Sequence, residues 1–237
     1  MPPAKILVVD DDPAIRNLIL RFLGQKDYQV ESADNGKMAL DIFSRFNPDL
    51  VILDINLPDT LGYNLCEEMQ QRTGVFVLML TGRTGAEDIE RGFKKGADDY
   101  LKKPFDLQEL EFRANAILKR RRTVTQTPQK QALIFDYLEI DPDRREITVN
   151  GNIVPFTALE FDLLFFLASH PGQALSRPQL ISEVWDYSEI VGDQRVVDVH
   201  IGQIRKKIEV DASQPSLIKT IRGFGYRFEP PNPNDEA

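Results

Sequence analysis

The sequence predicts a two-domain protein, in which an α/β domain with a five-stranded parallel sheet is followed by a smaller α+β domain. The first half alternates strand-like apolar runs with stretches of helical periodicity, as βα units do. The second half opens with short alternating strands, continues with three segments of helical length and ends in a glycine-rich hairpin. A polar stretch separates the halves, and 237 residues are enough to build two hydrophobic cores.

Five short apolar runs in the first half have the composition of buried strands. They are Lys5 to Val9, Gln29 to Ala33, Leu50 to Leu53, Val75 to Leu80 and Tyr100 to Leu101. Apolar residues recur at helical spacing in Ile15, Leu18, Ile19 and Phe22, and again in Leu110, Ala114, Ile117 and Leu118. Asp12, which precedes Pro13, is expected to cap the first helix. Residues 1–121 are therefore expected to form a flavodoxin-like sheet with helices on both faces.

The second half has a different order of elements. Polar residues dominate from Arg120 to Gln131, so we place a linker at residues 122–132, a second domain at 133–229 and an acidic tail at 230–237. Strands are predicted at Leu138 to Ile140 and Glu146 to Val149, with a hairpin turn at Asn150-Gly151. Helices are predicted at Ala158 to Ser169, Pro178 to Trp185 with Ser176 as N-cap, and Arg195 to Ile208, before a hairpin at Ile218 to Phe228. Helices followed by a hairpin with basic residues indicate a winged helix-turn-helix.

Composition narrows the function classes. The net charge is −8, with 18 basic against 20 acidic residues in 1–122 and 11 against 17 in 123–237, so any nucleic-acid binding must depend on a local basic patch. Cys66 is the only cysteine, which excludes a disulfide within the chain and favours a packing role. Apolar runs are far shorter than a membrane span, so a cytoplasmic protein without a membrane partner is the default expectation.

Charged and polar side chains gather where the predicted strands end. Asp10 and Asp11 follow the first strand, Asp54 closes the third, and Thr81 and Lys103 follow the fourth and fifth. Carboxyl ends of parallel strands meet at one edge, which is where open α/β sheets bind ligands. Carboxylates packed together need a cation, and oxygen ligands select a hard one, for which we predict Mg²⁺. The sequence therefore predicts a metal-bearing acidic pocket.

The motifs VVDDD, LVILDINLPD, MLTG and GADDYLKKPF, in this order, resemble the receiver domain of bacterial two-component response regulators. The resemblance implies that Asp54 is the phosphoacceptor, which attacks a phosphohistidine of a sensor histidine kinase. It implies that Asp11, Asp54 and the backbone carbonyl of Asn56 bind Mg²⁺ directly, and that Asp10 acts through water. Lys103 would supply a second positive charge near the phosphoryl group.

The same resemblance implies a switch and a dimer. Thr81 would move toward the phosphate while the aromatic ring of Tyr100 rotates inward, which alters a face used for dimerisation on phosphorylation. The residues that match intersubunit salt bridges in the family are Asp98, Asp99, Glu109, Arg113 and Arg120. The usual basic partner of Glu109 is replaced here by Ile89, which puts that pair in doubt.

The motifs FTALE, VVDVHI and TIRGFGYRF resemble the winged-helix effector domain of the OmpR/PhoB subfamily of response regulators. In the helix containing VVDVHI, Val197, Ile201, Ile204 and Ile208 form one apolar stripe to be buried. The opposite face would carry Arg195, Val196, Val199, Gly202, Gln203 and Lys206. An exposed valine suits contact with a thymine methyl group in the major groove.

Basic residues concentrate around this helix. Between Arg195 and Arg227 lie seven basic against three acidic residues, a local charge of +4 that suits contacts to DNA phosphates. His200 and Lys207 are candidates for backbone contacts, Arg205 for base contact and Arg222 for the minor groove. The full set of expected DNA contacts is Arg195, Val199, His200, Gln203, Arg205, Lys206, Lys207, Thr220 and Arg222. Family members often carry two arginines where this chain has Gly202-Gln203, so their operator sequence cannot be transferred.

The expected function is that of a transcriptional response regulator, not an enzyme. Phosphorylation of Asp54 would promote dimerisation, and the dimer would bind tandem half-sites on double-stranded DNA. By family analogy, the loop Trp185 to Asp193 is a candidate contact for RNA polymerase. One alternative is an Mg²⁺-dependent phosphohydrolase, but such enzymes place a general acid where this chain has Asn56, which cannot protonate a leaving group. A second alternative is a phosphorelay or protein-interaction module that does not bind DNA.

Overall fold

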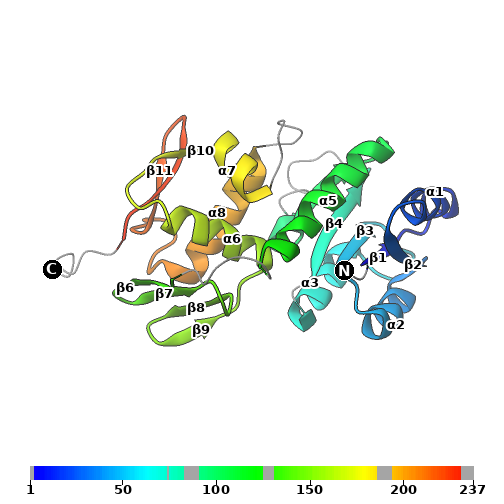
Figure 1. The fold of residues 1–237 in the computed structure, drawn as a ribbon, viewed down its shortest axis with the longest axis horizontal. Coiled ribbons are helices and arrows are strands. Elements are labelled where there is room, and N and C mark those ends of the chain that lie inside the picture. Colours follow the sequence, from blue (N-terminus) through cyan, green and yellow to red (C-terminus); the bar gives the residue numbers. More distant parts are fainter. Residues whose placement is uncertain (1–2, 74, 83–90, 125–130, 186–193, 231–237) are drawn as a thin grey trace. The chain divides into compact units, whose positions relative to one another are not determined.

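The computed structural model describes residues 3–73, 75–82, 91–124, 131–185 and 194–230. The chain divides into two compact units, Met1–Arg122 and Thr123–Ala237. Figure 1 shows a sheet with helices in the first unit, and helices with two small sheets in the second.

The first unit is built on a parallel five-stranded sheet. Its strands are β1 (Ala4–Val9), β2 (Tyr28–Ala33), β3 (Leu50–Asp54), β4 (Phe76–Thr81) and β5 (Asp99–Lys102), in the order β2-β1-β3-β4-β5. Each lies within one residue of its predicted bounds at either end. Strands β1, β3 and β4 are almost entirely buried, because helices cover both faces of the sheet. The predicted flavodoxin-like arrangement is confirmed.

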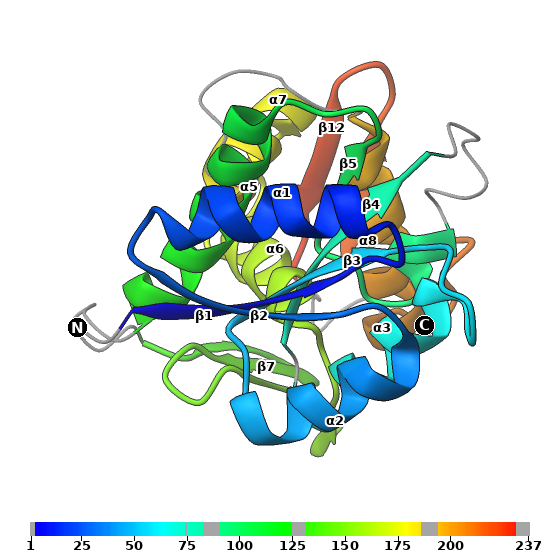
Figure 2. The ribbon, with the colours of Figure 1, turned by 90° about the vertical axis from the view of Figure 1, so that its right-hand side faces the viewer.

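The helices of this unit are α1 (Pro13–Gly24), α2 (Gly36–Phe46), α3 (Gly62–Thr73) and α5 (Leu107–Val124), and residues 91–94 are also helical. Figure 2 shows α1 and α5 on one side of the sheet and α2 and α3 on the other. On the first side, Tyr28 donates a hydrogen bond to Asn115 at 2.5 Å and Lys26 pairs with Glu111 at 3.1 Å. These contacts tie α5 to the connection between α1 and β2.

Helix α1 buries a slightly different face from the predicted one. Ile19 and Leu23 are fully buried, whereas Leu18 is 50% exposed. Successive residues of an α-helix are about 100° apart, so Leu18 lies at the edge of the stripe that Ile19 centres. The Asp12 side chain accepts a hydrogen bond from the Ala14 amide at 2.8 Å, which confirms the predicted cap.

Helix α5 buries the four apolar residues predicted for it and extends further than expected. Leu110, Ala114, Ile117 and Leu118 are all buried. The helix continues to Val124, three residues into the predicted linker. The prediction ended the helix where the polar residues begin. Arginine is a good helix former, so the run of consecutive arginines continues the helix instead of ending it. The rest of the predicted linker lies outside the described residues except for Gln131 and Ala132.

The second unit begins with an antiparallel sheet of four strands in sequence order. The strands are β6 (Leu133–Phe135), β7 (Leu138–Asp141), β8 (Glu146–Val149) and β9 (Asn152–Val154). Asn150 and Gly151 have φ values of 50° and 76°, so the predicted two-residue turn joins β8 to β9. Strands β6 and β9 were not predicted, because three residues are too few for a visible alternation.

Three helices and a second small sheet complete this unit. The helices are α6 (Ala158–Ala168), α7 (Arg177–Trp185) and α8 (Arg195–Ile208), and the sheet has the order β10 (Leu175–Ser176), β12 (Gly225–Phe228), β11 (Ile218–Ile221). The predicted helices and final hairpin are confirmed, whereas β10 was missed. Figure 1 shows α6 and α8 packed above the four-stranded sheet. None of the described helices combines the length and the hydrophobicity needed to cross a bilayer.

Candidate functional site

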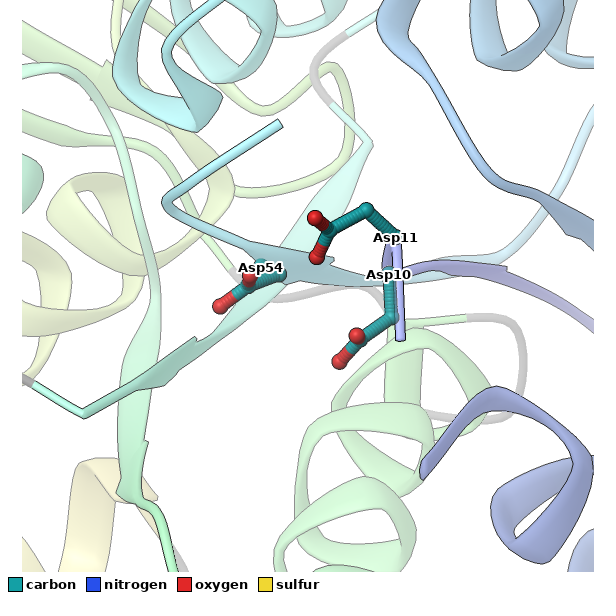
Figure 3. Close-up of side chains that lie close together, drawn as sticks. All are labelled: Asp10, Asp11 and Asp54. Atoms are coloured by element: carbon teal, nitrogen blue, oxygen red, sulfur yellow. The ribbon is translucent and has the colours of Figure 1, made fainter. Parts of the chain in front are cut away.

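Three carboxylates converge at the carboxyl edge of the parallel sheet. Val9 pairs with Leu53, so the residues that follow them, Asp10 and Asp54, lie on neighbouring strands. Figure 3 shows Asp10 and Asp11 reaching from the end of β1 toward the side of Asp54. Ligand oxygens of the three residues lie within 4.8 Å of one another. Asp10 and Asp54 are buried and Asp11 is exposed, so the cluster has an inner wall and an open side.

Lys103 lies directly against the two buried carboxylates. Its Nζ is 2.7 Å from Asp10 Oδ2 and 3.1 Å from Asp54 Oδ1. Burial raises the pKa of Asp54, although attraction to Lys103 and the hydrogen bond from it act in the opposite direction. Burial alone would lower the pKa of Lys103, but the hydrogen bond to Asp10 and the charges of both carboxylates raise it overall. The ammonium therefore stays charged and partly neutralises the cluster.

The remaining predicted residues of this pocket lie around the same edge. Thr81 is buried at the end of β4, and its carbonyl accepts a hydrogen bond from the Lys103 amide at 2.7 Å. Tyr100 lies on β5, and its ring meets the ring of Phe93 edge to face, with centroids 4.8 Å apart. Asn56 is exposed two residues beyond Asp54, at the start of the loop that leads to α3.

Two residues that support the pocket were not predicted. Arg16, in α1, donates hydrogen bonds to the backbone carbonyls of Asp10 at 2.7 Å and Asp11 at 3.4 Å, and so braces the acidic loop. Asp59 accepts from the amides of Gly36 and Lys37 at 2.8 and 2.9 Å, which holds the loop after β3 on the first turn of α2. Arg16 could have been found as a basic residue one turn into α1, because helical side chains point back toward the N-terminus. Asp59 had no such signal, since its partners are 22 or more residues away in the chain.

Gly62 packs against the strand end that carries Asp54. A Cβ atom at Gly62 would lie 2.2 Å from the Asp54 carbonyl oxygen and 3.0 Å from Ile55 Cα, and both are backbone atoms. We expect Gly62→Ala to lower the free energy of unfolding by about 1–3 kcal/mol and to slow the expected phosphorylation of Asp54. Thermal unfolding and a phosphorylation time course would measure both. Gly24→Ala is the control, because nothing lies within 4 Å of its Cβ; equal behaviour of the two variants would contradict the packing argument.

The residues expected at a dimer interface make contacts within one subunit. Arg113 pairs with Asp99 at 2.8 Å and with Glu109 at 2.8 Å. Asp98 accepts a hydrogen bond from the Val77 amide at 2.7 Å. Asp98 is 1% exposed, so an intersubunit role requires its carboxylate to become accessible to a second subunit. Arg120 lies in α5, but its side chain is outside the described part of the structure, as is Ile89.

In the second unit, helix α8 presents the two faces that the sequence predicts. Val197, Ile201, Ile204 and Ile208 are buried. The opposite side is at least partly exposed and includes Arg195, Val196, Val199, Gly202, Gln203 and Lys206. Arg222 and Thr220 are exposed on the hairpin formed by β11 and β12, which we call the wing. Helix α8 and the wing together present an exposed surface that contains Arg195, Lys206 and Arg222.

Three of the expected DNA contacts have partners within the domain, and one of them, His200, is corrected by its burial. His200 is 1% exposed and its ring lies against that of Trp185, with centroids 5.7 Å apart, so it belongs to the core. Arg205 donates hydrogen bonds to the Ile218 carbonyl at 2.5 Å and to Thr220 Oγ1 at 2.8 Å, and so contacts the wing. Lys207 is 2.5 Å from Glu160 Oε2. Helical spacing could not reveal these partners, because all of them come from other elements.

Gly202 is the unusual residue of helix α8. A Cβ at this position would meet nothing within 4 Å, and the residue is not in the left-handed region. Gly202→Ala is therefore expected to raise the free energy of unfolding by about 1 kcal/mol, since alanine loses less backbone entropy in a helix. A higher melting temperature in calorimetry would support this expectation, and a lower one would contradict it.

A hydrogen-bonded cluster that the sequence did not reveal joins α7, α8 and β12. Asp198 Oδ1 accepts from Arg177 Nε at 2.6 Å and from the Tyr226 hydroxyl at 2.7 Å. The Arg177 guanidinium also lies over the Tyr226 ring, 5.0 Å from its centroid. Asp198 is the single acid in the first turn of α8. This acid among basic residues was the one feature of the sequence that could have indicated the cluster.

Tyr226 gives this cluster a pH signature. Burial, together with the hydrogen bond to Asp198, raises the pKa of Tyr226 from 10.0 to about 12. The native state thus favours the neutral phenol, so the stability this gives is complete below about pH 10 and is lost as the pH rises through about 12. We expect the free energy of unfolding to fall more steeply over this range in the wild type than in Tyr226→Phe. Parallel denaturant titrations with the same pH dependence would contradict the assignment.

Two family models match the chain, one in each unit. The model described as "Response regulator receiver domain" matches residues 6–115, and the one described as "Transcriptional regulatory protein, C terminal" matches residues 151–228. The first match spans the acidic cluster, Thr81 and Lys103. The second spans α8 and the wing.

Relatives extend the similarity over nearly the whole chain. A probable transcriptional regulator, ycf27, of Porphyridium aerugineum is 40% identical over 233 residues, which cover 97% of each chain. The transcriptional regulatory protein ResD of Bacillus subtilis is 37% identical over 230 residues, which cover 95% of each chain. Among solved structures, a RitR mutant matches with a TM-score of 0.74 at 26% identity, over 96% of this chain and 100% of that one.

A receiver domain with an acidic phosphoacceptor site, joined to a winged-helix domain, defines a response regulator that acts as a transcription factor rather than as an enzyme. The chain belongs to the OmpR/PhoB-type family of two-component response regulators. The receiver implies a kinase partner, and the C-terminal domain implies DNA binding. The phosphohydrolase alternative is thereby excluded.

Proposed function

We propose that a sensor histidine kinase phosphorylates this response regulator on Asp54 and that phosphorylation controls its dimerisation on DNA. In this proposal, residues 1–121 receive the phosphoryl group, 122–132 connect the domains, 133–229 bind DNA and 230–237 form an acidic tail. The observation that carries the proposal is the contact of Asp54 with Lys103, beside Asp10 and Asp11. This arrangement presents a carboxylate nucleophile in a pocket that already contains one cation.

The donor set fits Mg²⁺. The three carboxylates offer hard oxygen ligands within 4.8 Å of one another, and Asp11 is on the open side of the cluster. Asp11, Asp54 and the backbone carbonyl of Asn56 would hold the ion, with Asp10 acting through water. When bound, Mg²⁺ would screen the repulsion between the Asp54 carboxylate and the phosphoryl oxygens.

Asp54 supplies the nucleophile for the transfer itself. Its carboxylate oxygen attacks phosphorus, and the bond from phosphorus to the donor histidine nitrogen breaks, so that nitrogen keeps the electron pair. Lys103 can turn its ammonium from the two carboxylates to a phosphoryl oxygen, because it is already within 3.1 Å of Asp54. Thr81, at the end of the next strand, can donate its hydroxyl to a second oxygen.

Phosphorylation would change the face near Tyr100. Movement of Thr81 toward the phosphate removes a side chain from the space between β4 and β5, and Tyr100 would turn into it. In the neighbouring region, Arg113 forms ion pairs with Asp99 and Glu109 of the same subunit. In a dimer, these residues could pair instead with the corresponding residues of the second subunit. Arg120 and Asp98 would add pairs to the same interface. The dimer would thus replace intramolecular ion pairs with intermolecular ones.

The dimer would place two α8 helices on adjacent DNA half-sites. Arg195, Val199, Gln203 and Lys206 face outward on α8 and would enter the major groove, while Arg222 in the wing would reach the minor groove and Thr220 the backbone. Because the second unit carries a net negative charge, a single monomer is expected to bind DNA weakly. In a dimer, binding of one subunit raises the effective concentration of the other at the adjacent half-site. The loop predicted from Trp185 to Asp193 would contact RNA polymerase through residues 186–193, which lie outside the described part of the chain. Trp185 itself is the last residue of α7 and is buried.

Genome-wide mapping of bound DNA tests this function. We expect the wild type to occupy promoter sites in a phosphorylation-dependent manner and Asp54→Ala to lose most of that occupancy. Equal occupancy by the two proteins would show that phosphorylation is not the switch. Absence of occupancy by either would favour the module that does not bind DNA.

A further inference from the structure

The joint between helix α8 and the wing contains an acid in a surface otherwise suited to DNA. Asp198 lies in the first turn of α8, between the exposed Arg195 and the partly exposed Val199. An acidic side chain at this position would repel DNA phosphates, so DNA binding alone does not explain why an acid is present here. Its carboxylate instead accepts two hydrogen bonds, from Arg177 at the start of α7 and from Tyr226 on β12. Asp198 thus joins three elements of the unit.

Tyr226 is well placed to transmit this contact to the wing. It is buried on β12, the central strand of its sheet, where it pairs with Leu175 on one side and Thr220 on the other. Arg177 lies over its ring at 5.0 Å from the centroid and Arg205 at 5.5 Å.

Arg205 completes the connection from the other end of α8. It donates hydrogen bonds to the carbonyl of Ile218 and to the hydroxyl of Thr220, both on β11. The wing is therefore fixed to α8 at two points, one near each end of the helix. Bidentate or charge-assisted hydrogen bonds of this kind define orientation as well as adding stability.

We propose that Asp198, held between Arg177 and Tyr226, is a positioning residue that fixes the wing against helix α8 so that both reach DNA together. The proposal rests on the proposed use of α8 and Arg222 as DNA contacts. In this role, Asp198 does not touch DNA. It sets the distance between the outward face of α8 and the tip of the wing, where Arg222 is exposed.

The direction in which the Asp198→Ala substitution changes the affinity for DNA tests the proposal. The probe is a DNA duplex selected by the wild-type protein from a random pool, with the dissociation constant measured by fluorescence anisotropy. Asp198→Ala removes a negative charge from the surface, so a residue that merely faced DNA would give tighter binding once replaced. A positioning residue gives the opposite result, and we expect binding about tenfold weaker. The control Asp211→Ala removes the same charge from an exposed loop outside α8 and should bind as tightly as the wild type or tighter.

A double-mutant cycle tests whether the effect passes through the wing. Tyr226→Phe keeps the buried ring under its two cations and removes only the hydroxyl. We expect it to weaken binding about tenfold in the wild-type background and less than about twofold in the Arg222→Ala background. The second effect is smaller because the wing of Arg222→Ala no longer contains the arginine whose DNA contact depends on the position of the wing. Equal costs in the two backgrounds would mean that Tyr226 acts on DNA independently, and would overturn the proposal.

A spectroscopic readout separates positioning from loss of fold. Alkaline titration of tyrosinate absorbance should show a late-titrating component in the wild type that is absent in Tyr226→Phe and titrates earlier in Asp198→Ala. If Asp198→Ala shows this earlier titration with an unchanged melting temperature and yet binds DNA more tightly than the wild type, the positioning role is wrong. If Arg222→Ala and Lys206→Ala leave DNA binding unchanged, the proposed DNA surface fails as well, so the two failures can be distinguished.

Discussion

Asp54→Asn is expected to abolish phosphoryl transfer to the receiver and, with it, the dimerisation that we propose to depend on phosphorylation. The amide has nearly the same shape as the carboxylate but is not a nucleophile, and it offers the acidic cluster one negative charge fewer. Incubation with acetyl phosphate and Mg²⁺, followed by mass spectrometry, should show an added phosphoryl group in the wild type and none in the variant. Sedimentation of the same samples should show a dimer only for the phosphorylated wild type.

Asp12→Asn is the matched control for this variant. Asp12 is exposed in the same loop and caps α1 through its side-chain oxygen, a role that asparagine performs equally well. It should therefore be phosphorylated and dimerise like the wild type. Phosphorylation of Asp54→Asn at an unchanged rate would show that another side chain is the acceptor.

Stability provides an internal check on the same variant. The pKa of Asp54 is raised mainly by burial, so the ionised form of its carboxyl is disfavoured in the native state. By linkage, the stability contributed by this group is present below its unfolded pKa and is lost as the pH rises through the higher native value. Asp54→Asn should melt at the same temperature as the wild type at neutral pH, or higher. Lost phosphorylation in this variant then cannot be attributed to unfolding.

The double variant Lys206→Ala with Arg222→Ala is expected to weaken DNA binding by about 100-fold. Both side chains are exposed, one on the outward face of α8 and one on the wing. Loss of an arginine from a groove costs about 1–3 kcal/mol, and loss of a lysine from a phosphate contact weakens binding to all sequences. The slope of log K against log salt should become less steep by about 1 for each phosphate contact removed.

A control for that double variant is Lys37→Ala with Lys102→Ala, which removes the same charge from exposed positions on the receiver. If binding depends only on net charge, the two double variants will lose affinity equally. If it depends on α8 and the wing, the control will retain nearly all of its affinity. Unchanged binding by Lys206→Ala with Arg222→Ala would favour a module that binds protein instead of DNA.

Periodicity and composition were sufficient to predict the elements that position the candidate site. The five strands of the receiver are short apolar runs bounded by polar turns, so their ends, and with them Asp10, Asp54, Thr81 and Lys103, could be placed within one residue. The apolar stripe of α8 was predicted correctly because a helix repeats every 3.6 residues. Short edge strands such as β6 and β10 escaped, since two or three residues contain no period.

What the sequence by itself determined is therefore the order of elements, the edge at which the acidic residues meet and the side of α8 that faces outward. These follow from local periodicity and from the rule that parallel strands end at a common edge. Only the tertiary structure decided which charged side chains are engaged within the protein. His200 is buried, Arg205 binds the wing, and Asp198 joins Arg177 to Tyr226, because such contacts link residues far apart in the chain whose distance no local pattern encodes.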